Sequence, residues 1–245
     1  MRIALVSDIH GNQLALEAVL RDVRAQGVEQ VACLGDVATL GPQPLAVLHT
    51  LEELGCPCIM GNHDEFLLQP ELVARYTKAE VIAEAIAWCH AQLGPRELAF
   101  IAGFKATAEL PLDGEHKLFL FHGSPDSHTC DLLATTPEAE LDQVLAGRKA
   151  AVMAGGHTHI QMLRQHRGTL LLNPGSVGMP FERYVAGARP IIMPYAEYAV
   201  VSAEHGRIAV DLRRVPLDKH ALHAAAASWP RAPSLLRADL MLQYA

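Results

Sequence analysis

Acidic and imidazole side chains come directly after the first predicted strand of the chain. Residues Arg2 to Ser7 form a mostly apolar run typical of a buried strand, and Asp8 and His10 follow it. Because side chains alternate along an extended backbone, Asp8 and His10 point the same way. Asp8 and His10 are therefore either polar residues at the end of a sheet or half of the ligands of a metal site.

Further polar residues stand at the ends of later predicted strands. They are Asp36, Asn62, His63, His122, His157 and His159. In an open α/β sheet the carboxyl ends of the strands converge on one crevice, where ligands normally bind. These residues are far apart in the sequence, but we expect them to meet in space.

The types of these side chains favour a site for two metal ions. Apart from His63, the set offers two carboxylates, one amide oxygen and four imidazoles, which suit divalent Mn, Fe, Co, Ni or Zn. A closed structural zinc site is not favoured, because the set holds no thiolate. Seven ligands exceed the needs of one ion. If one carboxylate bridges, two ions can each receive four protein ligands.

Each of these residues has a simpler interpretation when taken alone. Asp8 and His10 fit an exposed strand end, Asp36 a helix cap, Asn62 a turn, and His122 a hydrogen-bonded histidine beside a turn. Their joint occurrence at strand ends favours the metal site. The histidines at 49, 90, 116, 220 and 223 belong to no such motif and are predicted to lie on the surface.

Hydrophobic periodicity predicts the elements that position these residues. In the first part, strands over 3–6, 28–34 and 57–60 alternate with helices over 14–24 and 45–54. This βαβαβ pattern favours a parallel sheet with helices packed on it. Further on we predict helices over 79–93 and 137–145, strands over 150–153 and 169–172, and hairpins over 100–121 and 198–213.

Composition and charge limit the class of protein. The chain has 245 residues and a formal net charge of −7, which argues against a protein that binds long nucleic acid. Its five cysteines form no known disulfide pattern. We see no signal-like or membrane-spanning segment. A soluble cytoplasmic protein is the expectation, with one domain over 1–245 and a loop over 179–194 as a lid or substrate loop. A helical tail is expected over 217–245, broken at Pro230 and Pro233.

Five short blocks resemble those of a known family. Asp-x-His, Gly-Asp, Gly-Asn-His-Asp, His-Gly and Gly-His-Thr-His lie in this order over residues 8 to 159. Together they resemble the calcineurin-like metallophosphoesterase superfamily. The later block Asn173-Pro174-Gly175-Ser176 resembles the small bacterial and archaeal branch that includes YfcE-like phosphodiesterases.

The resemblance implies a fold and a division of the ligands. The fold is a four-layer α/β/β/α sandwich of two mixed sheets with flanking helices, with both predicted hairpins in the second sheet. The first ion is implied to be held by Asp8, His10, Asp36 and His159. Asp36 bridges to the second ion, which Asn62, His122 and His157 complete.

The resemblance also implies a reaction. Two divalent ions deprotonate a bridging water, and the hydroxide attacks the phosphorus of a phosphate ester in line. His63 faces the substrate and donates a proton to the departing alkoxide. The expected activity is that of a phosphodiesterase on a small or nucleotide-like substrate, with Mn or Zn among the possible metals.

The sequence departs from the protein phosphatase branch of this superfamily. That branch carries Gly-Asp-x-x-Asp-Arg, whereas this chain has Thr39 and Leu40 in place of the last acid and arginine. A protein phosphatase is therefore not expected, and His63 lacks an assigned orienting partner. Substrate phosphate would then rely on the metals, on His63 and on a residue of the 179–194 loop, for which Arg183, Tyr184 and Arg189 are the candidates.

Three other functions compete with a phosphodiesterase. A phosphomonoesterase would use the same ligands. A protein-binding scaffold, as in the retromer subunit of this fold, could lose His63 or a ligand, and this chain keeps them all. A nuclease for long DNA predicts a basic surface, which the acidic balance disfavours. Apolar residues near 181–195 fit either a lid or a dimer contact.

Overall fold

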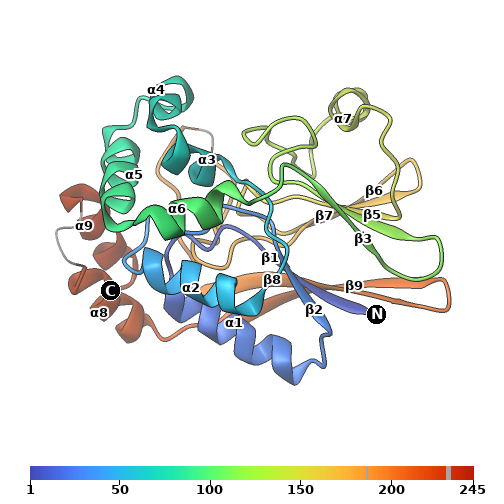
Figure 1. Ribbon diagram of the computed structural model, residues 1–245, viewed down its shortest axis with the longest axis horizontal. Coiled ribbons are helices and arrows are strands. Elements are labelled where there is room, and N and C mark those ends of the chain that lie inside the picture. Colours follow the sequence, from blue (N-terminus) through green and yellow to red (C-terminus); the bar gives the residue numbers. More distant parts are fainter. Residues whose placement is uncertain (186, 230–232) are drawn as a thin grey trace.

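The computed structural model describes residues 1–185, 187–229 and 233–245. Two mixed sheets lie face to face (Figure 1). The first has the order β2 (Gln30–Cys33), β1 (Arg2–Val6), β8 (Tyr195–Glu204) and β9 (Arg207–Pro216). The second has the order β3 (Ala108–Pro111), β4 (Lys117–Leu120), β5 (Val152–Ala154), β7 (Thr169–Asn173) and β6 (Met162–His166). Each sheet contains parallel and antiparallel pairs.

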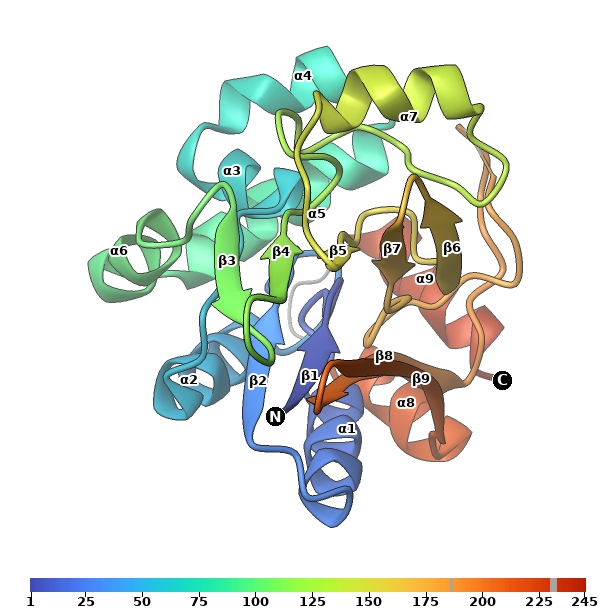
Figure 2. The same cartoon turned by 90° about the vertical axis from the view of Figure 1, so that its right-hand side faces the viewer.

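Helices cover the outer faces of both sheets. Helices α1 (Gln13–Ala25) and α2 (Pro44–Leu54) lie against the first sheet, and α7 (Glu138–Leu145) lies against the second (Figure 2). The remaining helices gather at one end of the molecule (Figure 1). They are α3 (Asn62–Leu68), the 3-10 helix η1 (Pro70–Leu72), α4 (Val73–Tyr76), α5 (Glu80–Gln92), α6 (Pro95–Ala102), α8 (Lys219–Ala227) and α9 (Ser234–Gln243).

The alternation of β1 places apolar side chains on both faces of its sheet. Ile3 and Leu5 pack between the sheets with residues of β4, β5 and β8, whereas Ala4 and Val6 pack against α1 and α2. All four side chains are fully buried. A strand buried on both faces needs an apolar layer on each side. The predicted four-layer α/β/β/α fold is therefore confirmed.

The strand predicted from residue 100 was wrong over its first half. Helix α6 occupies Pro95–Ala102, and β3 begins only at Ala108. The backbone N–H of Gly94 donates to Glu97 Oε2 at 2.8 Å, and Pro95 stands in the first turn. These are helix-start signals. Gly94 and Pro95 therefore begin a new helix as well as ending α5.

Two further expectations about the sheets were wrong. The β8–β9 hairpin pairs antiparallel with β1 in the first sheet, with Leu5 opposite Ala199, and does not belong to the second sheet. The segment over 57–60 forms only isolated bridges, from Cys58 to Cys33 and from Ile59 to Lys105. Because α3 begins at Asn62, this segment is too short to form a regular strand.

The C-terminal helices pack against the α5 end of the molecule. Leu222 of α8 and Leu236 and Leu240 of α9 share one buried cluster with Ala85 of α5 and Ile192. Residue 186 of the predicted loop and residues 230–232 of the predicted tail, including a helix break expected at Pro230, lie outside the described residues. None of the described helices is long and apolar enough to cross a membrane.

Candidate metal centre

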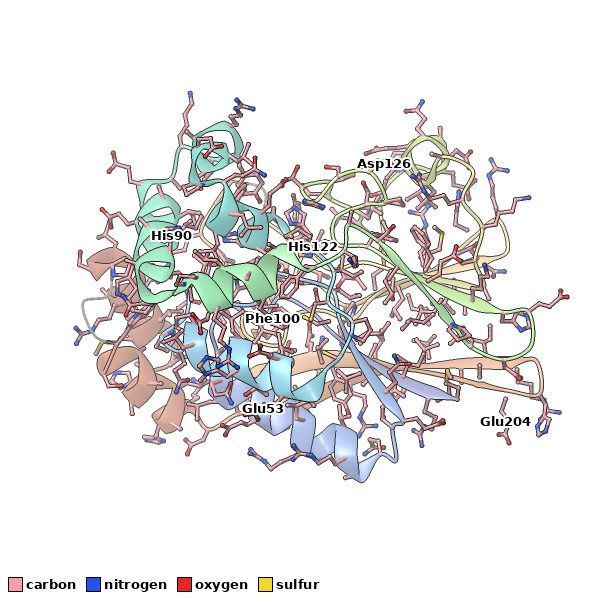
Figure 3. The ribbon with its side chains drawn as sticks, viewed as in Figure 1. Glu53, His90, Phe100, His122, Asp126 and Glu204 are labelled. Atoms are coloured by element: carbon pink, nitrogen blue, oxygen red, sulfur yellow. The ribbon has the colours of Figure 1, made fainter. Side chains whose placement is uncertain are left out.

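The eight predicted site residues lie at the ends of strands or at the start of α3, and they converge. Asp8 and His10 follow β1, Asp36 follows β2, His122 follows β4, and His157 and His159 follow β5. All except His157 are buried. His122 lies in the middle of the molecule, whereas His90 lies on α5 at its edge (Figure 3). The structure thus separates the clustered histidines from those predicted to be surface residues.

One group of side chains gathers around His159. The nearest side-chain ligand atoms of Asp8, His10 and His159 all lie within 4.8 Å of one another. Nε2 of His159 is 3.3 Å from Asp8 Oδ1 and 3.1 Å from His10 Nε2. These three residues are the ones expected, together with Asp36, at the first ion.

A second group gathers around His122. Ligand atoms of Asp36, His122 and His157 lie within 4.8 Å of one another. Nε2 of His122 is 3.1 Å from Asn62 Oδ1 and 3.5 Å from Asp36 Oδ2. The same Asp36 oxygen is 3.9 Å from His10 Nε2 in the first group. Asp36 therefore lies between the two groups, where a bridging carboxylate must lie.

Hydrogen bonds fix which ring nitrogen of His159 and of His122 is free to bind a metal ion. Nδ1 of His159 is 2.7 Å from the carbonyl oxygen of Met179, and Nδ1 of His122 is 2.6 Å from that of Leu34. A carbonyl oxygen only accepts hydrogen bonds, so Nδ1 carries the proton and Nε2 is unprotonated in each neutral ring. The buried Asp8 Oδ1 has no hydrogen-bond donor. In their neutral forms, which metal binding requires, both rings present Nε2 as an acceptor beside the carboxylates, and this set of acceptors fits two metal ions.

Burial and the two carboxylates set the charge state of the histidines. Burial, with a contribution from His159, lowers the pKa of His10 to about 3. Burial also lowers the pKa of His63 to about 4. Although burial opposes its charged form, Asp36 raises the pKa of His122 to about 10. Asp8 likewise raises the pKa of His159 against the effect of burial, so each carboxylate favours the charged form of one neighbouring histidine.

Backbone strain is concentrated at the same residues. Asp8, His10, Asp36, His157 and His159 have φ angles between 47° and 69°. This left-handed region costs an L-residue about 1 kcal/mol or more. Only nine of the described residues other than glycine have a positive φ. Five of these nine are predicted ligands, so the strain marks a functional site that the chain holds in place.

Glycines allow the backbone to approach the carboxylates. A Cβ atom on Gly61 would collide with the side chain of Asp36, and one on Gly156 would collide with Ser7 and Asp8. The glycines of the Gly-Asn-His-Asp and Gly-His-Thr-His blocks are therefore needed for close packing around the acids.

Thr39 is the partner of His63 that the sequence left unassigned. Its Oγ1 is 2.9 Å from His63 Nδ1 and 3.5 Å from His10 Nδ1. Thr39 is fully buried. It stands where the phosphatase branch carries an acid, so a neutral hydroxyl holds the His63 ring in this chain. His63 also lines a cavity beside the two groups of ligands.

Asp64 organises the loop that carries Asp36. Its carboxylate accepts the backbone N–H groups of Asp36 at 2.7 Å, Val37 at 3.0 Å and Gly61 at 3.0 Å. The bond from Gly61 caps the start of α3. Burial and the nearby charge of Asp36 raise the pKa of Asp64 to about 7. Asp64 therefore stabilises the backbone that positions Asp36.

The 179–194 loop contacts the site directly through Phe181, whose ring stacks on that of His159, and indirectly through Tyr184. The Tyr184 hydroxyl donates to Asp131 Oδ2 at 2.5 Å, and Asp131 Oδ1 is 3.4 Å from His157 Nε2. Asp131 was not singled out in the sequence, because nothing in its local pattern links it to His157. Of the other two candidates in the loop, Arg183 is exposed and Arg189 forms an ion pair with Asp239.

Known proteins were compared with the chain and its structure. The family model described as calcineurin-like phosphoesterase superfamily domain matches residues 1–189. An uncharacterized protein of Methanocaldococcus jannaschii is 31% identical over 193 residues, which cover 73% of this chain and 76% of that protein.

Two solved structures share the fold over nearly the whole chain. A metallophosphoesterase from Sphaerobacter thermophilus has a TM-score of 0.74 at 24% identity, and the match covers 99% of this chain and 100% of that one. A hypothetical protein from Pyrococcus horikoshii has a TM-score of 0.81 at 18% identity, covering 98% and 97%.

Proposed function

The chain belongs to the calcineurin-like phosphoesterase superfamily, and we propose that it is a phosphodiesterase for small or nucleotide-like substrates that uses two divalent metal ions. The observation that carries this proposal is the convergence of carboxylate, imidazole and amide acceptors, with Asp36 between the two groups. Asp8, His10 and His159 would hold one ion, and Asn62, His122 and His157 the other.

The ions, when bound, would make a water nucleophilic near neutral pH and neutralise the phosphoryl oxygens of the ester. The chain supplies the proton for the leaving group. In the free protein the ring of His63 is neutral at pH 7, since burial lowers its pKa to about 4. An anionic ester beside the ring favours its charged form. His63 then donates from Nε2 to the departing alkoxide, while the Thr39 hydroxyl accepts from Nδ1.

The charges around the site favour a diester over a monoester. A monoester carries up to two negative charges near neutral pH, and a diester carries one. Leu40 occupies the place of the arginine found in the phosphatase branch, and the side chain of Arg189 is already paired with Asp239. Arg183 is exposed and does not line the cavity beside the centre, where Arg189 is the only guanidinium among the described lining residues. The singly charged diester is therefore the better match.

The test compares two chromogenic esters. Metal-stripped protein is assayed with bis(p-nitrophenyl) phosphate and with p-nitrophenyl phosphate, while Mn, Ni, Zn and Mg are added back singly. We expect metal-dependent turnover of the diester that is lost in Asp36→Asn and reduced in His63→Ala. His90→Ala, which removes an exposed histidine on α5, is the matched control.

Two of the alternative functions, the phosphomonoesterase and the scaffold, have their own results in this test. A clear preference for the monoester would assign a phosphomonoesterase. If two ions bind but neither ester is hydrolysed with any metal, the scaffold replaces the enzyme as the best account.

A further inference from the structure

A cavity of about 740 Å³ opens beside the metal centre. His10, Asp36, Asn62 and His63 line its inner end. Its outer walls come from the start of α5, from the loop before β8 and from α9. Their side chains are mainly aliphatic and include Val81, Ile82, Val185, Ile192, Leu235 and Leu236. A group attached to a phosphate at the centre would therefore extend between apolar walls.

The outer walls present little charge to a substrate. Among the described residues that line the cavity beyond the histidines and Asp36, the charged side chains are Arg189 and Asp239. These two form an ion pair with each other. A second phosphate or a carboxylate entering here would lose water without gaining a free cation, which is unfavourable. An apolar group would instead gain from burial.

The walls are held in position by the fold. Ile192 and Leu236 belong to one buried cluster with Met179 and Leu240. The backbone N–H of Ile192 donates to Gln243 Oε1 of α9 at 2.6 Å. The loop and α9 are therefore joined to each other, and the cavity is formed before a ligand arrives.

We propose that this cavity binds an apolar substituent of the substrate, so that the enzyme selects phosphodiesters with one negative charge and an alkyl or aryl group. The proposal rests on the phosphodiesterase function above and specifies its substrate class. An ester that carries additional phosphates is a poor substrate on this account, because the described residues of the outer walls offer them no free cation.

The test varies one substituent and keeps the leaving group constant. The substrates are p-nitrophenyl esters of methyl, hexyl and phenyl phosphate, and of thymidine 5′-phosphate with and without a 3′-phosphate. Full burial of one methylene group increases the binding affinity about fourfold. We expect kcat/KM for the hexyl ester to exceed that for the methyl ester by at least about tenfold, allowing for incomplete burial. The 3′-phosphate should lower kcat/KM, and the hexyl and phenyl esters distinguish alkyl from aryl preference.

A variant in the wall links the preference to this cavity. Ala238 lines the cavity from α9 and is exposed, so Ala238→Trp should fill the space without disturbing the core. The ratio of kcat/KM between the hexyl and methyl esters should then approach one. Ala224→Trp, at an exposed position of α8 outside the cavity lining, is the matched control and should keep the wild-type ratio.

The outcomes separate this inference from the function it rests on. If the methyl and hexyl esters are hydrolysed equally well, the apolar selectivity is overturned while the phosphodiesterase stands. An unchanged ratio in Ala238→Trp also overturns it, because the substituent then binds elsewhere. If no ester is hydrolysed with any metal, both the function and the inference fail.

Discussion

The metal centre and the cavity wall beside it are in contact but are built in different ways. The centre consists of polar residues at strand ends, buried and held partly in the left-handed region, as at Asp8 and His159. The wall consists of aliphatic side chains from α5, α9 and the loop between β7 and β8, such as Ile82 and Leu236. The first region supplies reactive groups at fixed positions, and the second supplies shape and apolar surface. Substitutions in the two regions should therefore have different consequences.

The largest effect is expected for Asp36→Asn. The substitution removes a buried charge that lies between the two groups of ligands. Metal ions contribute several kcal/mol to the stabilisation of transition-state charge. We therefore expect kcat/KM to fall by about 10³-fold or more, with loss of bound metal.

The test of Asp36→Asn measures metal content by elemental analysis together with diester hydrolysis. Asp126→Asn, at an exposed aspartate, should retain both. Full metal content and activity in Asp36→Asn would contradict its bridging role.

The next effect is expected for His63→Ala, which leaves the proposed ligands intact. Loss of a general acid reduces a rate by about 10²–10⁴-fold. The loss should be greater for an alkyl leaving group than for p-nitrophenolate, which departs without a proton. Metal content should match that of the wild type. An equal loss for both leaving groups would show that His63 does not act as the proton donor.

A smaller effect is expected for Thr39→Val, which removes the hydroxyl beside His63 Nδ1 and keeps the shape of the side chain. Groups that orient functional histidines contribute about 10–100-fold, and we expect about tenfold in kcat with little change in KM. The pH dependence of kcat should shift as well. Thr39→Ser should restore the rate, because it restores the hydroxyl. If Thr39→Ser is as slow as Thr39→Val, the methyl group and not the hydrogen bond is what matters.

The smallest effect is expected for the buried Glu197 of β8, which lies outside both regions, and is measured as stability. Burial raises the pKa of Glu197 to about 7 although Arg214 opposes the shift. A carboxyl with a raised pKa in the folded state stabilises the fold fully below its unfolded value of 4.5, and this contribution is lost as the pH rises through about 7. Between pH 5 and pH 8 the wild type should therefore lose about 1–2 kcal/mol relative to Glu197→Gln, since the ion pair with Arg214 favours the charged form and offsets part of the shift.

Denaturant unfolding at the two pH values measures this difference. Glu204→Gln is the matched control, because Glu204 is exposed at the end of β8 (Figure 3). It should follow the wild type at both pH values. If Glu197→Gln also follows the wild type, the Glu197 carboxyl titrates normally in the folded protein.

The two regions also differ in how far the sequence predicts them. The ligand candidates could be found because each ends a short apolar run, and strand ends in such folds meet at one edge. The wall could not be found, because the proximity of Leu236 to Ile192 depends on how α9 packs. Thr39 was missed as a partner of His63 because a threonine after a turn has many local roles. The hairpin over 198–213 was predicted, but its pairing with β1 is a long-range contact that periodicity does not encode.

The most direct test of the account is anomalous diffraction at the manganese edge from crystals of the protein loaded with Mn. The account predicts two peaks about 3.5–4 Å apart, with Asp36 between them. Asp8, His10 and His159 should contact one peak, and Asn62, His122 and His157 the other. A single peak, or peaks bound to other residues, would contradict the two-ion centre.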